Sequence, residues 1–132
     1  MGKSGQRVLV VEDEAMQALD IEQMLTDAGY QAILADNAPM ALQEAGSWHE
    51  PAAAAIIDLH FIEGMQGGTL ITRLRELWPG LPVVVVTGYS PRDPAADLRG
   101  LGGPTARLHK PLQTDRLLQR LRDAIQSSSG VA

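Results

Sequence analysis

Cysteine is absent from the 132-residue sequence, which excludes a disulfide scaffold, a cysteine-ligated zinc site and a thiol nucleophile. No apolar run approaches the ~20 residues that a membrane-spanning helix needs, and residues 1–6 lack the apolar stretch of a signal peptide. Basic residues are in the minority, with 11 Lys and Arg against 16 Asp and Glu, so the formal net charge is −5. That sign argues against a domain that binds nucleic acid or an anionic membrane. We therefore expect a cytoplasmic protein.

Hydrophobic residues make up 45% of the chain, which is enough to build a buried core. The length suits one domain, and no internal repeat, linker or low-complexity segment divides it. We expect this domain to span residues 1–132, with a folded core from about residue 6 to 126 and a flexible tail over residues 127–132.

Short β-branched runs alternate along the chain with longer segments of helical periodicity. The runs are continuous in apolar residues, which is typical of strands buried on both faces of a parallel sheet. We expect strands at residues 7–11, 31–35, 53–57, 82–86 and 106–109, and helices at 15–28, 37–46 and 67–77, from 93–94 onwards, and from Thr114 as a cap to about residue 126.

Apolar residues recur at three- and four-residue spacing in the helical segments, and we expect them to face the sheet. These stripes are Ala18, Ile21, Leu25 and Ala28; Leu70, Leu74 and Leu77; and Leu117, Leu118, Leu121 and Ile125. Met16, Met24 and Met40 are interpreted as packing residues, and Gly29 follows the first helix where a left-handed cap belongs.

Residues able to carry chemistry follow four of the predicted strands. Glu12-Asp13-Glu14 follows the first strand, Asp58 the third, Thr87 the fourth and Lys110 the fifth. Because ligands bind beyond the carboxyl ends of the strands in such sheets, we expect these side chains to lie near one another.

Glu12, Asp13 and Asp58 would repel one another in one crevice, and Mg²⁺ relieves such repulsion through oxygen ligands. A simpler alternative makes residues 12–14 an acidic first turn of the following helix. Asp58 can be a nucleophile towards a phosphoryl group or a loop cap. Lys110 can supply a cation to that group or be an ordinary solvated lysine.

The set Glu12-Asp13, Asp58, Thr87-Gly88 and Lys110-Pro111, in this order over nearly the whole chain, resembles a response regulator receiver domain of two-component signalling. The resemblance implies a flavodoxin-like α/β fold, a doubly wound parallel sheet of five strands in the order 2-1-3-4-5 with five helices. It also implies a signalling domain rather than an enzyme, which assists only its own phosphorylation and dephosphorylation.

By this resemblance, Asp58 takes a phosphoryl group from a histidine kinase or histidine phosphotransfer protein and switches a surface towards an unknown downstream protein. Thr87 and Lys110 would contact the phosphoryl group, and the Lys110-Pro111 bond would be cis. A homodimer that depends on phosphorylation is compatible with the family.

The resemblance also implies a metal site. Mg²⁺, or Mn²⁺ in its place, would be bound directly by Asp13 and Asp58, through water by Glu12, and by the backbone carbonyl of His60.

One position in the predicted fifth strand departs from the usual receiver pattern. Receivers commonly carry an aromatic residue three positions before the lysine, where this chain has Arg107. Tyr89, two residues after Thr87, is an alternative carrier of the signal or a loop residue that covers apolar surface.

Two other functions compete with a phosphorylated receiver. A haloacid-dehalogenase-like phosphatase also uses Asp, Thr, Lys and Mg²⁺, but it needs a second acidic residue two positions after the nucleophile, where this chain has His60. The other is a receiver-shaped interaction domain that is never phosphorylated, and the retained Asp58, Thr87 and Lys110 argue against it.

The segment that opens at Asp93-Pro94 contains Gly100, Gly102, Gly103 and Pro104, all of which disfavour a stable helix. We predict that its amides exchange with solvent much faster than those of the helix from Thr114 onwards, as measured by hydrogen–deuterium exchange. Equal protection of the two segments would contradict the prediction.

Overall fold

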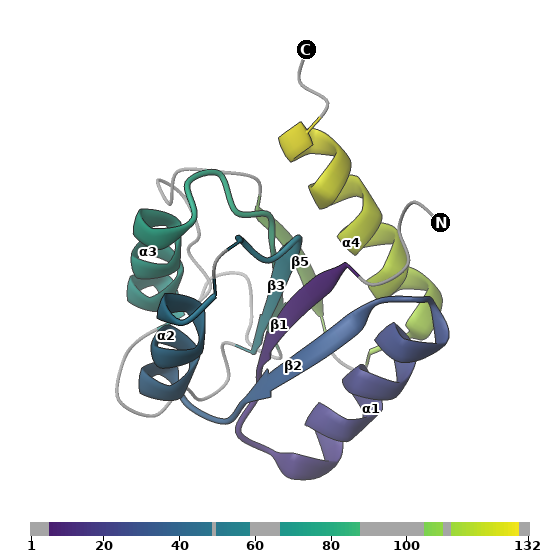
Figure 1. Cartoon of the computed structure of the whole chain (residues 1–132). Helices are drawn as coiled ribbons and strands as arrows, with labels where there is room; N and C mark the ends of the chain where they lie inside the picture. Colours follow the sequence, from purple (N-terminus) through teal and green to yellow (C-terminus); the bar gives the residue numbers. More distant parts are fainter. Residues whose placement is uncertain (1–5, 49, 59–66, 88–104, 110–111, 130–132) are drawn as a thin grey trace.

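Five parallel strands form the central sheet of the computed structural model (Figure 1). The structure describes residues 6–48, 50–58, 67–87, 105–109 and 112–129. Its strands are β1 (Arg7–Val11), β2 (Gln31–Ala35), β3 (Ala54–Asp58), β4 (Val83–Thr87) and β5 (Thr105–His109), and its helices are α1 (Ala15–Asp27), α2 (Ala38–Gly46), α3 (Gly67–Leu77) and α4 (Thr114–Ser129).

The strand order is β2-β1-β3-β4-β5, and every neighbouring pair is parallel. This confirms the predicted flavodoxin-like α/β class, its strand order and all five strands to within a residue or two. Four of the five expected helices are present at the predicted places, and the one expected from residues 93–94 onwards lies outside the described residues.

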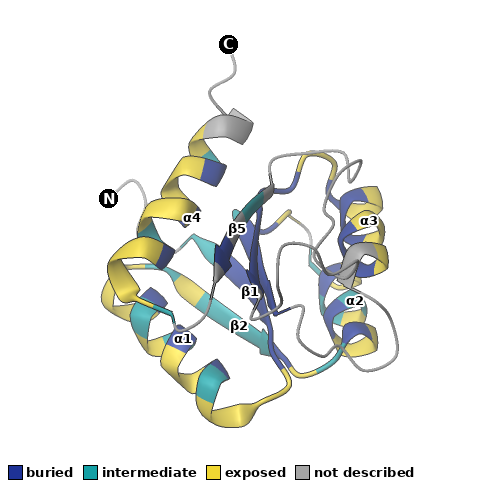
Figure 2. Cartoon of the chain, turned by 180° about the vertical axis from the view of Figure 1, so that it is seen from behind, coloured by how far each residue is buried: buried dark blue, intermediate teal, exposed yellow. Residues whose placement is uncertain are grey.

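Successive residues of each strand point to opposite faces of the sheet, so the core has two halves. In β1, Leu9 and Val11 pack with α2 and α3 on one face, while Val8 and Val10 pack with α1 and α4 on the other. Figure 2 shows the buried inner sides of the helices turned towards the sheet and their exposed sides turned outwards. Burial on both faces explains why the strands read as continuous apolar runs.

The ends of α1 and α2 follow the local signals in the sequence. Gly29 has a φ of +96°, and the Gly29 and Tyr30 amides donate to the Thr26 and Leu25 carbonyls at 3.0 and 2.9 Å, which is a Schellman cap. The side chain of Asn37 accepts from the Met40 amide at 2.7 Å and caps α2 as predicted.

The predictions for four residues on the helix faces are wrong. Ala28 is exposed at the C-terminal cap of α1. Leu77, the last residue of α3, is 47% exposed, whereas Ile71 within the helix and Trp78 directly after it are buried. Met16 and Met40 are 71% and 42% exposed because each lies two residues, about 200°, from a buried alanine of its helix.

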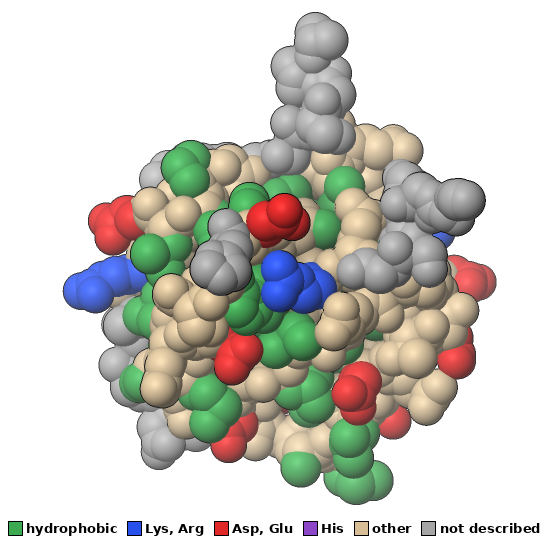
Figure 3. All heavy atoms as spheres, viewed as in Figure 1, with side chains coloured by type: hydrophobic (Ala, Val, Ile, Leu, Met, Phe, Trp, Pro, Cys, Tyr) green, Lys and Arg blue, Asp and Glu red, His purple; other side chains and the backbone are tan. Residues whose placement is uncertain are grey.

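Met24, by contrast, is partly buried and packs against the core, as expected. Figure 3 shows the molecular surface from the same side as Figure 1, where hydrophobic side chains are interspersed with polar and charged ones.

Helix α4 is longer than the sequence predicts. It continues to Ser129, beyond the helix end at about residue 126 that the sequence predicts. Thr114 is the first residue of α4 rather than its cap, because the Leu117 amide donates to the carbonyl of Gln113. Leu117 and Leu121 are fully buried, and their packing stabilises the helix beyond what serine propensity alone supports. None of the described helices is long and apolar enough to cross a membrane.

A buried arginine fixes the connection from α3 to β4. The Nε and Nη2 atoms of Arg75 donate to the carbonyl of Leu81 at 3.0 and 2.9 Å, and Gly80 supplies the left-handed turn between them with a φ of +77°. Burial lowers the pKa of Arg75, but a guanidinium remains charged at neutral pH. This contact holds the start of β4, and therefore the strand that ends at Thr87.

We predict that Arg75→Met lowers the free energy of unfolding by about 1–3 kcal/mol, because it keeps the aliphatic packing but removes the donors to a buried carbonyl. Chemical denaturation measures the change. Arg73→Met, on the exposed side of the same helix, is the control and should alter stability by less than about 0.5 kcal/mol. Equal losses in the two variants would show that the Arg75 contact contributes nothing specific.

Candidate functional site

The adjacent strands β1 and β3 bring Glu12 and Asp58 to the same edge of the sheet. Val11 pairs with Ile57 in the parallel register, so the residues that follow them, Glu12 and Asp58, lie side by side. The Glu12 amide donates to the Ala35 carbonyl at 3.0 Å, which extends the pairing of β1 with β2 by one residue. The backbone at Glu12 is therefore held in place before α1 begins.

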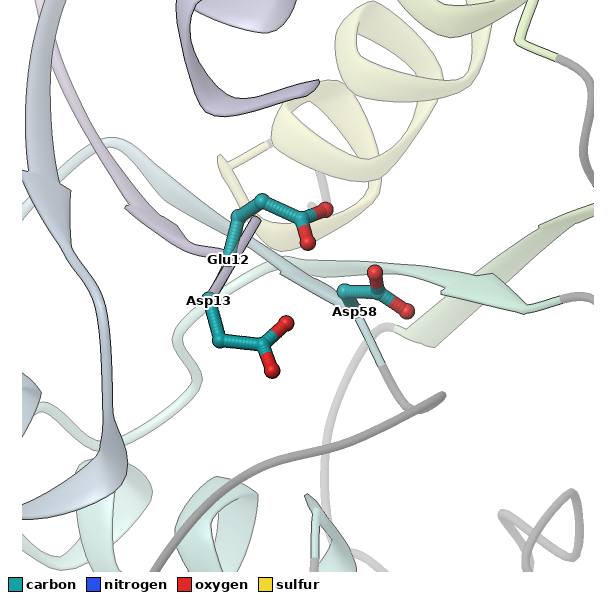
Figure 4. Close-up of side chains that lie close together, drawn as sticks. All are labelled: Glu12, Asp13 and Asp58. Carbon is teal, nitrogen blue, oxygen red and sulfur yellow. The ribbon is translucent and has the colours of Figure 1, made fainter. Parts of the chain in front are cut away.

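Glu12, Asp13 and Asp58 form the acidic cluster that the sequence predicts (Figure 4). One carboxylate oxygen from each residue lies within 4.8 Å of the other two. Glu12 and Asp58 are each only 3% exposed, whereas Asp13 is more open to solvent. The predicted convergence of these three side chains at the strand ends is confirmed.

The alternative that residues 12–14 form an acidic first turn is wrong. Helix α1 begins at Ala15, Glu14 is its N-cap residue, and no acidic residue lies in its first turn. The Glu14 side chain makes no capping hydrogen bond. Glu12 and Asp13 therefore belong to the edge of the sheet rather than to the helix.

The cluster has the chemistry of a site for a hard cation. Two unit charges 4 Å apart near a protein surface repel by about 4 kcal/mol, and here three carboxylates meet with two of them almost wholly buried. A divalent cation offsets this repulsion. The donor atoms are all oxygens, a set that suits Mg²⁺ or Mn²⁺ and not a thiolate-bound metal.

Gln17 is a member of the site that the sequence reasoning missed. Its side-chain amide donates to Glu12 Oε1 at 2.7 Å and to Asp58 Oδ2 at 3.2 Å. The other oxygen of Glu12 accepts from the Glu14 amide at 3.2 Å. The available signal was a polar residue four positions before buried Ile21, on the inward side of α1.

The backbone of Thr87 lies at the same edge of the sheet. Val86 pairs with Asp58 across β3 and β4, so Thr87 is the next residue along the neighbouring strand. Thr87 in turn pairs with His109, the last residue of β5. The other candidates lie outside the described residues. They are His60, Tyr89, and Lys110 with its predicted cis bond to Pro111.

A pocket of about 250 Å³ lies elsewhere, at the C-terminal ends of α2 and α3. Trp48, Leu77 and Trp78 are among its lining residues, none of which is titratable. The two indole rings are 5.3 Å apart between centroids. This pocket offers no ligand to a cation, so the acidic cluster remains the candidate for chemistry.

Comparison with known proteins gives a consistent result. The model of the response regulator receiver domain family matches residues 8–122. Transcriptional regulatory protein ZraR from Klebsiella oxytoca is 29% identical over 124 residues, which are 92% of this chain but 27% of that protein. The chain thus spans about a quarter of the length of this curated relative.

Two solved structures share the fold. A CheY-like receiver domain protein from Methanospirillum hungatei JF-1 has a TM-score of 0.84 and 23% identity, covering 98% of this chain and 100% of its own. The receiver domain of sensor histidine kinase PA1611 from Pseudomonas aeruginosa PAO1, with magnesium coordinated in its active site cleft, has a TM-score of 0.79 and 23% identity, covering 92% and 98%.

We predict that Asp13→Asn raises the free energy of unfolding by about 1 kcal/mol when divalent cations are removed with EDTA, because it relieves repulsion among three carboxylates. Chemical denaturation in EDTA measures the gain. Asp20→Asn, which removes the same charge from the exposed face of α1, is the matched control and should change stability little. A gain no larger than that of the control would mean that the cluster carries little repulsion.

Proposed function

The chain belongs to the response regulator receiver domain family, and we propose that Asp58 is its phosphoacceptor. The phosphoryl donor is a phosphohistidine of a histidine kinase or of a histidine phosphotransfer protein. One observation supports this most strongly: Asp58 ends a fully buried strand with its carboxylate beside those of Glu12 and Asp13. A nucleophilic carboxylate in such a place is partly desolvated and fixed in direction.

In the proposed transfer, one carboxylate oxygen of Asp58 attacks phosphorus. The bond from phosphorus to the histidine nitrogen breaks, and an acyl phosphate forms on Asp58. When held by Glu12, Asp13, Asp58 and the His60 carbonyl, Mg²⁺ would neutralise charge on the phosphoryl oxygens. The donor atoms of the three described carboxylates fit that ion.

Thr87 and Lys110 complete the proposed site. Thr87 ends the strand next to Asp58, and its hydroxyl can donate to a phosphoryl oxygen. Lys110 follows β5, which pairs with β4 up to Thr87 and His109, and its ammonium can pair with the phosphoryl charge. Both groups respond to a charge that exists only after Asp58 is modified.

The proposed output is a change of binding surface. To move a switch from 1:99 to 99:1, phosphorylation must favour the active form by about 5.5 kcal/mol. A few charge-assisted hydrogen bonds from Thr87 and Lys110 are of that order in total. The surface near β5 and α4 is the proposed output face, for a downstream protein or a second copy of the chain, and the setting is cytoplasmic.

We predict that the native chain, incubated with Mg²⁺ and a small acyl-phosphate donor, gains one phosphoryl group, which intact mass spectrometry detects. Asp58→Ala should gain none, because no other carboxylate occupies its place. Asp36→Ala is the matched control, since Asp36 directly follows β2 and is exposed. It should label like the native chain.

Equal labelling of native protein and Asp58→Ala would refute the assignment of Asp58. A native chain that takes no label from either the small donor or a phosphohistidine protein would instead be a receiver-shaped interaction domain. Turnover of many phosphoester molecules without a trapped acyl phosphate would favour a phosphatase.

A further inference from the structure

Gln17 contacts both buried carboxylates of the acidic cluster at once. Its Nε2 atom is 2.7 Å from Glu12 Oε1 and 3.2 Å from Asp58 Oδ2. The two acceptors are separated by 46 positions in the sequence, and they belong to different strand ends. A single side chain from α1 therefore joins the ends of β1 and β3.

The chemistry of the two partners decides the orientation of the Gln17 amide. A carboxylate accepts hydrogen bonds and has no proton to donate when ionised, so the NH₂ group must face it. An amide carbonyl in that position would meet two negatively charged oxygens and be repelled. The NH₂ group has two hydrogens, and one is available to each carboxylate.

We infer that Gln17 is a positioning residue, which holds the carboxylates of Glu12 and Asp58 in the orientation that a divalent cation and an incoming phosphoryl group require. This inference rests on the proposed function of Asp58. Its mechanism is electrostatic and geometric. Two hydrogen bonds to one neutral donor reduce the repulsion between the carboxylates and restrict their rotation.

The amide leaves room for a cation. A carboxylate has two oxygens with about four lone-pair sites, and the contact with Gln17 uses one site on Glu12 and one on Asp58. Residues that orient metal ligands in this way typically contribute 10–100-fold to metal affinity. A comparable effect is expected here, because one amide contacts both buried carboxylates at once.

Helix α1 makes Gln17 a rigid support. Ala18 and Ile21, which flank it on the inward side, are 7% and 1% exposed, so the helix is fixed against the sheet at this point. A donor on such a helix starts from a fixed backbone, so only its side-chain torsions are ordered when it binds the carboxylates. The neighbouring Met16 is exposed, whereas the side chain of Gln17 reaches both carboxylates.

The test is Mg²⁺ binding to Gln17→Met, a variant of similar length that has no donor. Isothermal titration calorimetry on the full chain, at a temperature where both proteins remain folded in EDTA, should show the dissociation constant rising at least tenfold. The Mg²⁺ concentration for half-maximal labelling by an acyl-phosphate donor should rise by the same factor. Gln17→Ala removes the same donor and provides a second measurement if Gln17→Met folds poorly.

Gln23→Met is the matched control. Gln23 lies on the same helix and also donates to a carboxylate, that of Asp27 at 2.9 Å, but on the exposed surface. It should leave Mg²⁺ binding unchanged. A Gln17→Met dissociation constant within twofold of the native value, or an equal rise in Gln23→Met, would overturn the inference.

Failure of the proposed function would look different. In that case the native chain itself would neither bind Mg²⁺ nor accept a phosphoryl group. Normal binding and labelling by the native chain, with no effect in Gln17→Met, would remove the role of Gln17 and leave Asp58 as phosphoacceptor.

Discussion

Glu12 and Asp58 carry like charges, are almost wholly buried and share one edge of the sheet with Asp13, so something must offset their repulsion. In the structure, backbone and side-chain donors do part of this: Glu14 and Gln17 bind Glu12, and Gln17 also binds Asp58. A hydrogen bond to a charged group contributes about 1.5–3 kcal/mol. The proposed divalent cation would offset the repulsion that these hydrogen bonds leave.

The two-sided core explains how the fold sustains such a cluster. Every residue of β3 up to Asp58 is buried, with apolar contacts on both faces, so the strand cannot shift to separate the charges. Arg75 holds the turn that leads into β4 by two hydrogen bonds to Leu81. The stability of the core therefore maintains an arrangement that is locally unfavourable. This is the condition in which a carboxylate can react with a phosphoryl group.

Local patterns predicted most of the fold because they act over a few residues. The caps at Asn37 and Gly29 and the valine run of β4 depend on neighbours in the chain. The errors occur where periodicity meets a helix end. Leu77 continues the spacing of the buried stripe but lies exposed at the last residue of α3, and Met16 lies off the stripe of α1. Spacing alone does not say how far the sheet extends beneath a helix.

The order of strands and acidic residues along the sequence determined that Glu12, Asp13 and Asp58 meet, because parallel strands place their carboxyl ends together. It did not determine which groups offset the repulsion among these three carboxylates. Only the tertiary structure shows that α1 crosses this edge with Gln17 facing inward and both carboxylates within reach of one amide. Hydrogen bonds of this kind require positions accurate to a few tenths of an ångström. That accuracy arises from the packing of a helix on a sheet, which no spacing in the sequence records.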